Sequence, residues 1–174
     1  MGAGILPVAF NGISVLFLLG QEKTGQWSDF GGSANDRYET KFKTAIREGH
    51  EELSGLLGNE YEIAMQIKNN YIGQINDDRY TTFIFKTNYD TTLPIHFKRN
   101  YNFVRKTTPY LIDMKHNGLY EKKKINWFTS QEIYNLELRP FYKKIIFKIL
   151  QNEKKIEKLF ADEVILSTNS DYAV

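Results

Sequence analysis

Three glutamates with the spacing of neighbours on one helix face have the clearest capacity for chemistry in this chain. Glu48, Glu51 and Glu52 directly follow Arg47. Residues at i, i+3 and i+4 share one face of a helix, so the three carboxylates lie side by side. Like charges at this spacing repel one another and require either open solvent or a cation between them. A divalent metal ion that takes oxygen ligands is such a cation.

The residues around the glutamates decide between these two environments. Glutamates on a helix face are usually solvated charge, and these three alone favour that interpretation. The adjacent Arg47, the upstream Glu39 and the pair Gly31-Gly32 after an aromatic segment favour a metal site instead. A helix over 40–53 must position the carboxylates, because its apolar residues recur at steps of three and four. This core-facing stripe consists of Phe42, Ala45, Ile46, Gly49 and Leu53.

The segment Gly31–Gly55 resembles the Nudix box, the signature of the Nudix hydrolase family. Five residues match it at the family spacing: Glu39, Arg47, Glu48, Glu51 and Glu52. Three positions depart from the pattern. Gly32 lies one position too far before Glu39, which indicates a loop one residue longer; Gly49 occupies the apolar position; and Ser54 stands where the closing glycine is expected, with Gly55 one position later.

The resemblance implies a role for each matching residue. Glu51 and Glu52 are implied as the main ligands of Mg²⁺ or Mn²⁺, and Glu48 as a ligand or as the general base. A backbone carbonyl of Gly31 or Gly32 is implied as a further ligand. Arg47 holds the acidic cluster in orientation, and Glu39 pairs with Arg47 or joins an outer metal.

The family implies a divalent-metal-dependent hydrolase that cleaves the diphosphate linkage of a nucleoside-diphosphate-type substrate. Capped RNA, dinucleoside polyphosphates and diphosphoinositol phosphates are rival substrates, and all are rich in phosphate. The rival from another class is a catalytically silent Nudix-fold module that binds a nucleotide or RNA. A base outside the box also stays open: Asp36, Asp77, Asp78 and Asp113 are candidates, although each is more typical of an ordinary turn residue.

The remaining elements are expected from local pattern. Strands are expected at 3–9 and 13–19 around Asn11-Gly12, and also at 26–31, 62–68, 71–75, 81–87, 111–114 and 125–128. Residues 88–106 are expected to form an irregular insertion, and one long helix runs from Pro140 to about Phe160. The pattern predicts an α/β fold, and the resemblance a Nudix-type α/β/α sandwich with a mixed sheet. One domain is expected over 1–160, followed by a loose tail over 161–174.

Composition excludes several classes of function. The 174 residues contain no cysteine, so thiol catalysis and zinc–thiolate sites are excluded. No apolar run reaches the roughly 18 residues of a membrane span, so no membrane contact is expected. The lack of cysteine and of a leader favours a cytoplasmic protein. Oligomeric state cannot be read from the pattern.

A lysine-rich arc on the expected final helix favours either a solvated face or a groove for RNA or polyphosphate. The formal net charge of only +2 does not by itself indicate nucleic acid. The residues concerned are Lys143, Lys144, Lys148, Lys154, Lys155 and Lys158, with Lys122, Lys123 and Lys124 nearby.

Overall fold

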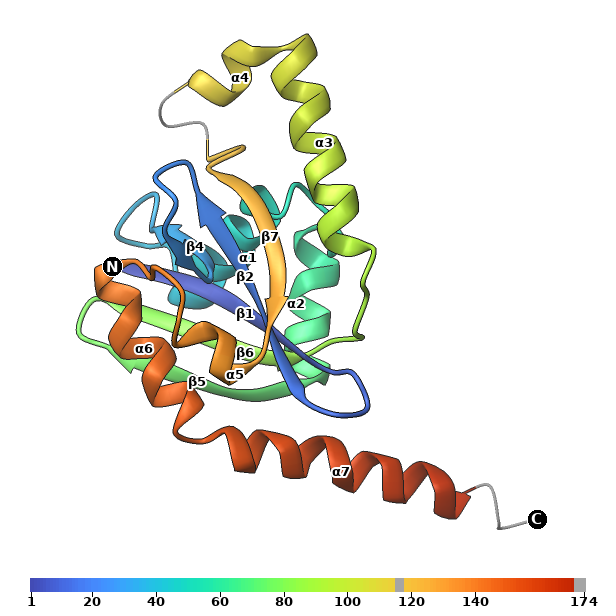
Figure 1. Cartoon of the computed structure of the whole chain (residues 1–174). Coiled ribbons are helices and arrows are strands. Elements are labelled where there is room, and N and C mark those ends of the chain that lie inside the picture. Colours follow the sequence, from blue (N-terminus) through green and yellow to red (C-terminus); the bar gives the residue numbers. More distant parts are fainter. Residues whose placement is uncertain (115–117, 171–174) are drawn as a thin grey trace.

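A computed structural model of the chain describes the backbone of residues 1–114 and 118–170 and the side chains of 1–114 and 118–162. Within these residues, seven strands form one mixed sheet with helices on both faces (Figure 1). The strands are β1 (Gly2–Phe10), β2 (Val15–Glu22), β3 (Trp27–Ser28), β4 (Phe30–Ser33), β5 (Tyr71–Asp77), β6 (Tyr80–Lys86) and β7 (Lys122–Phe128). The helices are α1 (Lys41–Glu52), α2 (Glu60–Asn69), α3 (Leu93–Thr107), α4 (Pro109–Asp113), α5 (Ser130–Ile133), α6 (Pro140–Leu150) and α7 (Glu153–Ser170).

Strand β1 lies at the centre of the sheet. It pairs in parallel with β6 and antiparallel with β2 and β4, while β7 extends the sheet from β2. Side chains alternate between the two faces of a strand. In β1, Ala3 and Ile5 therefore face the core beneath α1 and α2, whereas Leu6 and Val8 face the core beneath α6. The expected α/β/α sandwich with a mixed sheet is confirmed.

Three expected elements are wrong. Residues 62–68 belong to helix α2 rather than to a strand, because Asn59 caps the helix and Ile63 and Ile67 pack from successive turns. The expected insertion over 88–106 contains helix α3, and the expected strand over 111–114 falls on helix α4. These two helices form an arm beside β7, with a small apolar cluster of their own.

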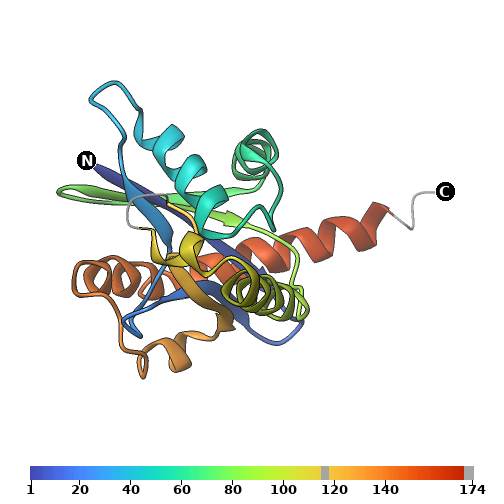
Figure 2. The same ribbon diagram turned by 90° about the horizontal axis from the view of Figure 1, so that it is seen from above.

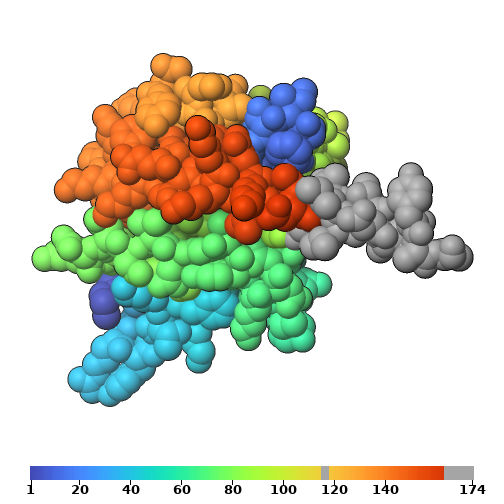
Figure 3. Space-filling model, turned by 90° about the horizontal axis from the view of Figure 1, so that it is seen from below, coloured from blue at the N-terminus to red at the C-terminus, as the bar shows by residue number. Residues whose placement is uncertain are grey.

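The expected final helix is broken at Gln151 and Asn152 into α6 and α7. Helix α6 covers the second face of the sheet and contacts β5, and α7 runs past the sheet edge (Figure 2). Figure 3 shows α6 and the start of α7 against the segment that contains β5 and β6. The expected boundary near residue 160 falls inside α7, residues 171–174 lie outside the described residues, and the tail stays a prediction. None of the helices in the described part of the chain is long and apolar enough to cross a membrane.

Candidate active site

Helix α1 carries the glutamates and lies unusually close to the sheet. Thr40 caps its first turn by accepting a hydrogen bond from the Lys43 amide at 3.2 Å. A Cβ atom at Gly49 would overlap the side chain of Ile5 on β1. Glycine at the apolar position of the motif therefore lets a large residue of the central strand fill that space. The helix end beside β4 is thereby held against the sheet.

Arg47 ties the acidic residues together. Its Nε donates to Glu39 Oε1 at 2.9 Å, and its Nη1 lies 2.9 Å from Glu48 Oε1 and 3.2 Å from Glu51 Oε2. Nη2 donates to the backbone carbonyl of Ser33 at 2.9 Å. The guanidinium lowers the pKa of Glu39 to about 2. Glu39 thus pairs with Arg47, and one guanidinium anchors three carboxylates to the end of β4.

The longer loop between β4 and α1 is held by its own side chains. Glu39 accepts from the amide of Asn35 at 2.8 Å and from the hydroxyl of Thr44 at 3.1 Å. Asp36 accepts from the amides of Tyr38 and Glu39 at 2.6 and 3.0 Å. Asp36 is therefore engaged as a turn residue, which disfavours it as the base.

Gly32 lies directly against Glu48. A Cβ atom at position 32 would come within 2.6 Å of the Glu48 carboxylate. The lack of a side chain at Gly32 therefore lets the carboxylate approach the backbone of β4. Burial raises the pKa of Glu48 and of Glu51, although Arg47 opposes the shift in both. A bound cation would favour the ionised form of both carboxylates and so offset the cost of their burial.

Glu52 has a different environment from the other two glutamates. Its side chain is 1% exposed, and Oε2 accepts from the Gly31 amide at 2.8 Å. Its Oε1 lies 3.4 Å from the ammonium of Lys122. Burial raises the pKa of Glu52 to about 8. Glu52 is thus enclosed between β4 and β7 instead of facing solvent.

Lys122 is fully buried, so the expectation that it forms part of an exposed basic groove is wrong. Its Nζ donates to Ser28 Oγ at 2.8 Å and lies 3.4 Å from Glu22. The stem of Lys122 fills space next to Gly20, where a Cβ atom would come within 2.9 Å of it. The lysine is the cation beneath the site, and the sequence run of three lysines did not distinguish it from its neighbours.

Asp29 is a second buried carboxyl that sequence reasoning missed. It lies in the break between β3 and β4 and accepts from Tyr80 at 3.0 Å and from Thr82 at 2.7 Å. Burial raises its pKa to about 6. Glycine at positions 4 and 31 leaves the space that the Tyr80 hydroxyl occupies.

An acidic cleft of about 650 Å³ lies above α1 and is lined by Arg47, Glu48, Glu51, Glu121 and Arg139 together with Gly31–Asn35 and Gly118. Glu52 does not line it. Glu121, which sequence reasoning missed, precedes β7 and reaches the cleft only through the sheet topology. All the carboxylates of the cleft are hard oxygen donors, the type that Mg²⁺ and Mn²⁺ prefer. Among the described residues, however, no three acidic, histidine or cysteine side chains are arranged to hold one metal ion.

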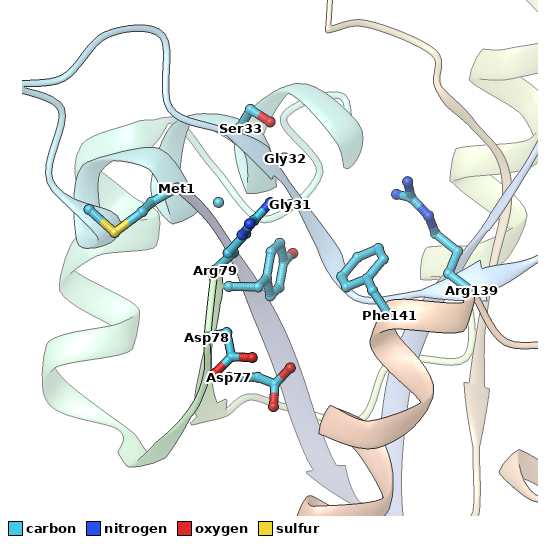
Figure 4. Close-up of a pocket in the computed structure, with 11 residues that line it drawn as sticks. Met1, Gly31, Gly32, Ser33, Asp77, Asp78, Arg79, Arg139 and Phe141 are labelled. Atoms are coloured by element: carbon cyan, nitrogen blue, oxygen red, sulfur yellow. The ribbon is translucent and has the colours of Figure 1, made fainter.

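A second cavity of about 640 Å³ lies on the other side of Gly31–Ser33 (Figure 4). Tyr80 and Phe141 line it with ring centroids 5.0 Å apart, and Asp77, Asp78 and Arg79 contribute charge. Arg139 lines both cavities and bonds Glu22 at 2.6 Å. The two cavities thus share one wall of glycine-rich backbone and one arginine.

No protein-family model and no curated protein matches the sequence. Among solved structures, an Ap4A hydrolase of C. elegans in a binary complex is similar, with 15% identity and a TM-score of 0.52 over 93% of this chain and 99% of that chain. The fold is the Nudix fold. At this identity the likeness shows the fold alone.

Other Nudix structures are similar at lower TM-scores. The Nudix domain of Shewanella oneidensis NrtR, complexed with ADP ribose, is 10% identical over 87% of this chain and 86% of that chain, with a TM-score of 0.47. A mutT/nudix family protein from Listeria innocua is 16% identical over 95% and 96%, with a TM-score of 0.45.

The expected basic arc does not form on one helix. Lys148 pairs with Asp77 at 3.1 Å, and Lys143 lies over the ring of Phe147. The break after α6 separates these residues from the lysines of α7. The arc predicted from a continuous helix is therefore wrong as a single surface.

Proposed function

We propose that this protein is a divalent-metal-dependent Nudix hydrolase that cleaves the diphosphate linkage of a nucleoside-diphosphate-type substrate. The observation that carries the proposal is the anchoring of Glu39, Glu48 and Glu51 by Arg47 beside a glycine-rich strand, at an open acidic cleft. The Nudix fold is consistent with it. Dinucleoside polyphosphates, capped RNA and diphosphoinositol phosphates are the substrate classes to compare.

We assign roles to the residues of the cleft on the same basis. Glu48 and Glu51, with a carbonyl of Gly31 or Gly32, hold Mg²⁺ or Mn²⁺, and water completes the shell of either ion. When bound, the ion neutralises phosphate charge and lowers the pKa of a water molecule. Arg47 orients the carboxylates.

Glu121 is our candidate for the proton acceptor. It lies outside the motif, lines the cleft that contains Glu48 and Glu51, and has no ion-pair partner among the described residues. A carboxylate in this position can take the proton of the attacking water at a side-chain oxygen. Glu52, enclosed beside Lys122, supports the start of β4 through the Gly31 amide.

The second cavity is suited to the organic part of the substrate. Tyr80 and Phe141 offer aromatic surface, and Arg139 on the shared wall reaches both cavities. A substrate that spans Gly31–Ser33 would place phosphate in the acidic cleft and its nucleoside against the rings. The guanidinium of Arg139 would then lie near the phosphates that join the two parts.

The test is release of phosphate and nucleotide from a panel of diphosphate compounds with Mg²⁺ or Mn²⁺. Wild type is compared with Glu51→Gln and with Glu157→Gln, a control that removes an exposed carboxylate on α7. Glu51→Gln should lower kcat by more than about 100-fold, since even residues that only support metal ligands cost 10–100-fold. Equal loss in the control, or turnover that is independent of metal, would contradict the proposal.

A catalytically silent module that binds nucleotide or RNA is the second candidate. Two observations favour it: Glu52 is enclosed with Lys122 at 3.4 Å, and no three metal-binding side chains converge among the described residues. This candidate gains support if wild type binds nucleotide tightly but turns over no compound of the panel with either metal.

A further inference from the structure

The outward face of helix α3 is basic. Leu93, Phe97, Tyr101 and Val104 are buried and mark the inner side of the helix. At 100° per residue, Arg99 and Lys106 point to the opposite side. Lys98 and Arg105 both lie roughly 100° to one side of them, and all four cations are exposed. We call these four residues the α3 basic face.

This segment carries positive charge without negative charge, as residues 138–152 around α6 also do. Residues 91–112 contain four Lys or Arg and no Asp or Glu, whereas the whole chain has a surplus of only two positive charges. In the part of the chain that the structure describes, none of the four cations has an ion-pair partner. Helix α7, by contrast, alternates its lysines with Glu153, Glu157 and Asp162. An unneutralised cluster of this kind attracts a polyanion.

One exposed aromatic ring lies among the cations, and a second lies on the next helix. Phe103 is 66% exposed and Tyr110 on α4 is 61% exposed. Phe103 follows Arg99 by one turn and precedes Lys106 by nearly one turn, so the ring lies between cations on the helix surface. Cations beside exposed rings are the arrangement on which single-stranded nucleic acids bind, since phosphates contact the cations and bases stack on the rings.

The arm also leads to the acidic cleft. Asp113 and Met114, at the end of α4, line a cavity of about 320 Å³ together with Glu22, Lys23 and Glu121. Glu121 in turn lines the acidic cleft. Lys23 donates a hydrogen bond to the carbonyl of Ile112 and so joins the arm to the end of β2. The end of α4 therefore shares one cavity with Glu121 of the acidic cleft. Figure 1 shows the arm beside β7, the strand that Glu121 precedes.

We propose that the α3 basic face, with Phe103 and Tyr110, binds single-stranded nucleic acid. The further statement that the diphosphate-bearing end of this strand enters the acidic cleft rests on the proposed function. The binding surface itself does not, because it is defined by the charge and exposure of the arm. Inorganic polyphosphate would use the cations without the rings.

The test is fluorescence anisotropy of an end-labelled 20-nucleotide RNA over a range of salt concentrations. Wild type is compared with the pair Arg99→Glu/Lys106→Glu. The matched control, Lys154→Glu/Lys158→Glu, makes the same change of charge on exposed residues of α7. Four phosphate contacts give a slope of log K against log salt of about −2.8, and loss of two reduces it by about 1.4. The α3 pair should bind at least about tenfold more weakly than the control.

Phe103→Ala tests the aromatic contribution separately. Loss of one stacked base should weaken binding about 5- to 150-fold without changing the salt slope. Both α3 variants change exposed side chains, and circular dichroism should match wild type. Failure of wild type to bind RNA, equal weakening by the α7 control, or an unchanged affinity in Phe103→Ala would each overturn the proposal.

Two further measurements distinguish this proposal from membrane binding and from the proposed hydrolase function. Anionic lipid vesicles that bind through α3 more tightly than RNA would assign the surface to a membrane and overturn the proposal. Hydrolysis of a small diphosphate compound should be unchanged in the α3 variants, since none of these residues lines the cleft. If no compound is hydrolysed but RNA binds through α3, the proposed function fails and the binding surface stands.

Discussion

Replacing Lys122 by Met would show whether the buried ammonium serves to compensate Glu52. Methionine retains an unbranched apolar stem but loses the group that lies 3.4 Å from Glu52 and 2.8 Å from Ser28. Glu22 keeps its contact with Arg139 at 2.6 Å. Only Glu52 is then left without a cation, and its remaining hydrogen bond comes from the Gly31 amide.

The expected loss of stability depends on pH. The pKa of Glu52 is raised to about 8, so between pH 4.5 and 8 the folded protein holds a proton that the unfolded chain has lost. Burial of this carboxyl therefore lowers stability as pH rises through that window, and the ionised form is present above it. At pH 7, Lys122→Met loses a charged hydrogen bond worth about 1.5–3 kcal/mol. Above pH 8 the difference from wild type grows by up to about 1.4 kcal/mol per pH unit. At pH 9.5 the difference in stability between Lys122→Met and wild type reaches about 3–5 kcal/mol, the loss expected when one partner of a buried ion pair is removed.

Urea unfolding at pH 7 and 9.5 measures both values. The double variant Lys122→Met/Glu52→Gln is the control, because it removes the carboxyl as well as the ammonium. The loss of unfolding free energy in the double variant, relative to wild type, should not increase above pH 8 as it does in the single variant. A loss in Lys122→Met that is equal at the two pH values would refute the coupling of Lys122 to Glu52.

Three further substitutions test the geometry around α1. Gly32→Ala places a Cβ atom 2.6 Å from the Glu48 carboxylate and should lower kcat by about 100-fold, as displacement of a reacting group does; unaltered turnover would contradict the assignment of Glu48 to the site. Gly49→Ala overlaps Ile5 and should destabilise by about 1–3 kcal/mol in urea unfolding, with partial recovery when Ile5→Val is added. Ser54 has a φ of +53°, so Ser54→Gly should stabilise by about 1 kcal/mol, and a lower midpoint would argue against strain there.

The resemblance of the motif predicted the sandwich fold, whereas local pattern alone predicted only the α/β class. Glu48 and Glu51 lie at the cleft and Glu39 pairs with Arg47, as the resemblance implied. These residues interact within one helix and its entry loop, so their relation is local. Their roles in catalysis and metal binding stay predictions until activity is measured.

Sequence reasoning missed the helices in which the pattern of apolar and polar residues is short or irregular. In residues 62–68 the alternation of apolar and polar residues suggested a strand, although Asn59 and Glu62 form a capping box that indicates a helix. In α3 the buried residues have helical spacing, but the polar, aromatic-rich composition of residues 88–106 suggested an irregular insertion. Pro94 is compatible with a helix because it lies in the first turn.

The deeper part of the site depends on tertiary structure. Nothing in the run Lys122–Lys124 distinguishes the buried lysine from the exposed ones, because its place is set by Gly20 on the paired strand. Glu121 and Arg139 reach the cleft from positions 66 and 84 residues after Gly55, the end of the motif. Such contacts require the topology of the whole sheet.

The arm is expected to unfold at a lower free energy than the sheet, because it has a small apolar cluster of its own. Tyr101, Val104 and Ile112 pack in a cluster separate from the two cores of the sheet. Units with few buried apolar contacts open at lower free energy than the core to which they are attached. Amide hydrogens of α4 and of the second half of α3 should therefore exchange with solvent before those of β1, and a ligand held on the arm should slow their exchange. The arm can thus lose its order and regain it while the sheet and the carboxylates of α1 stay folded.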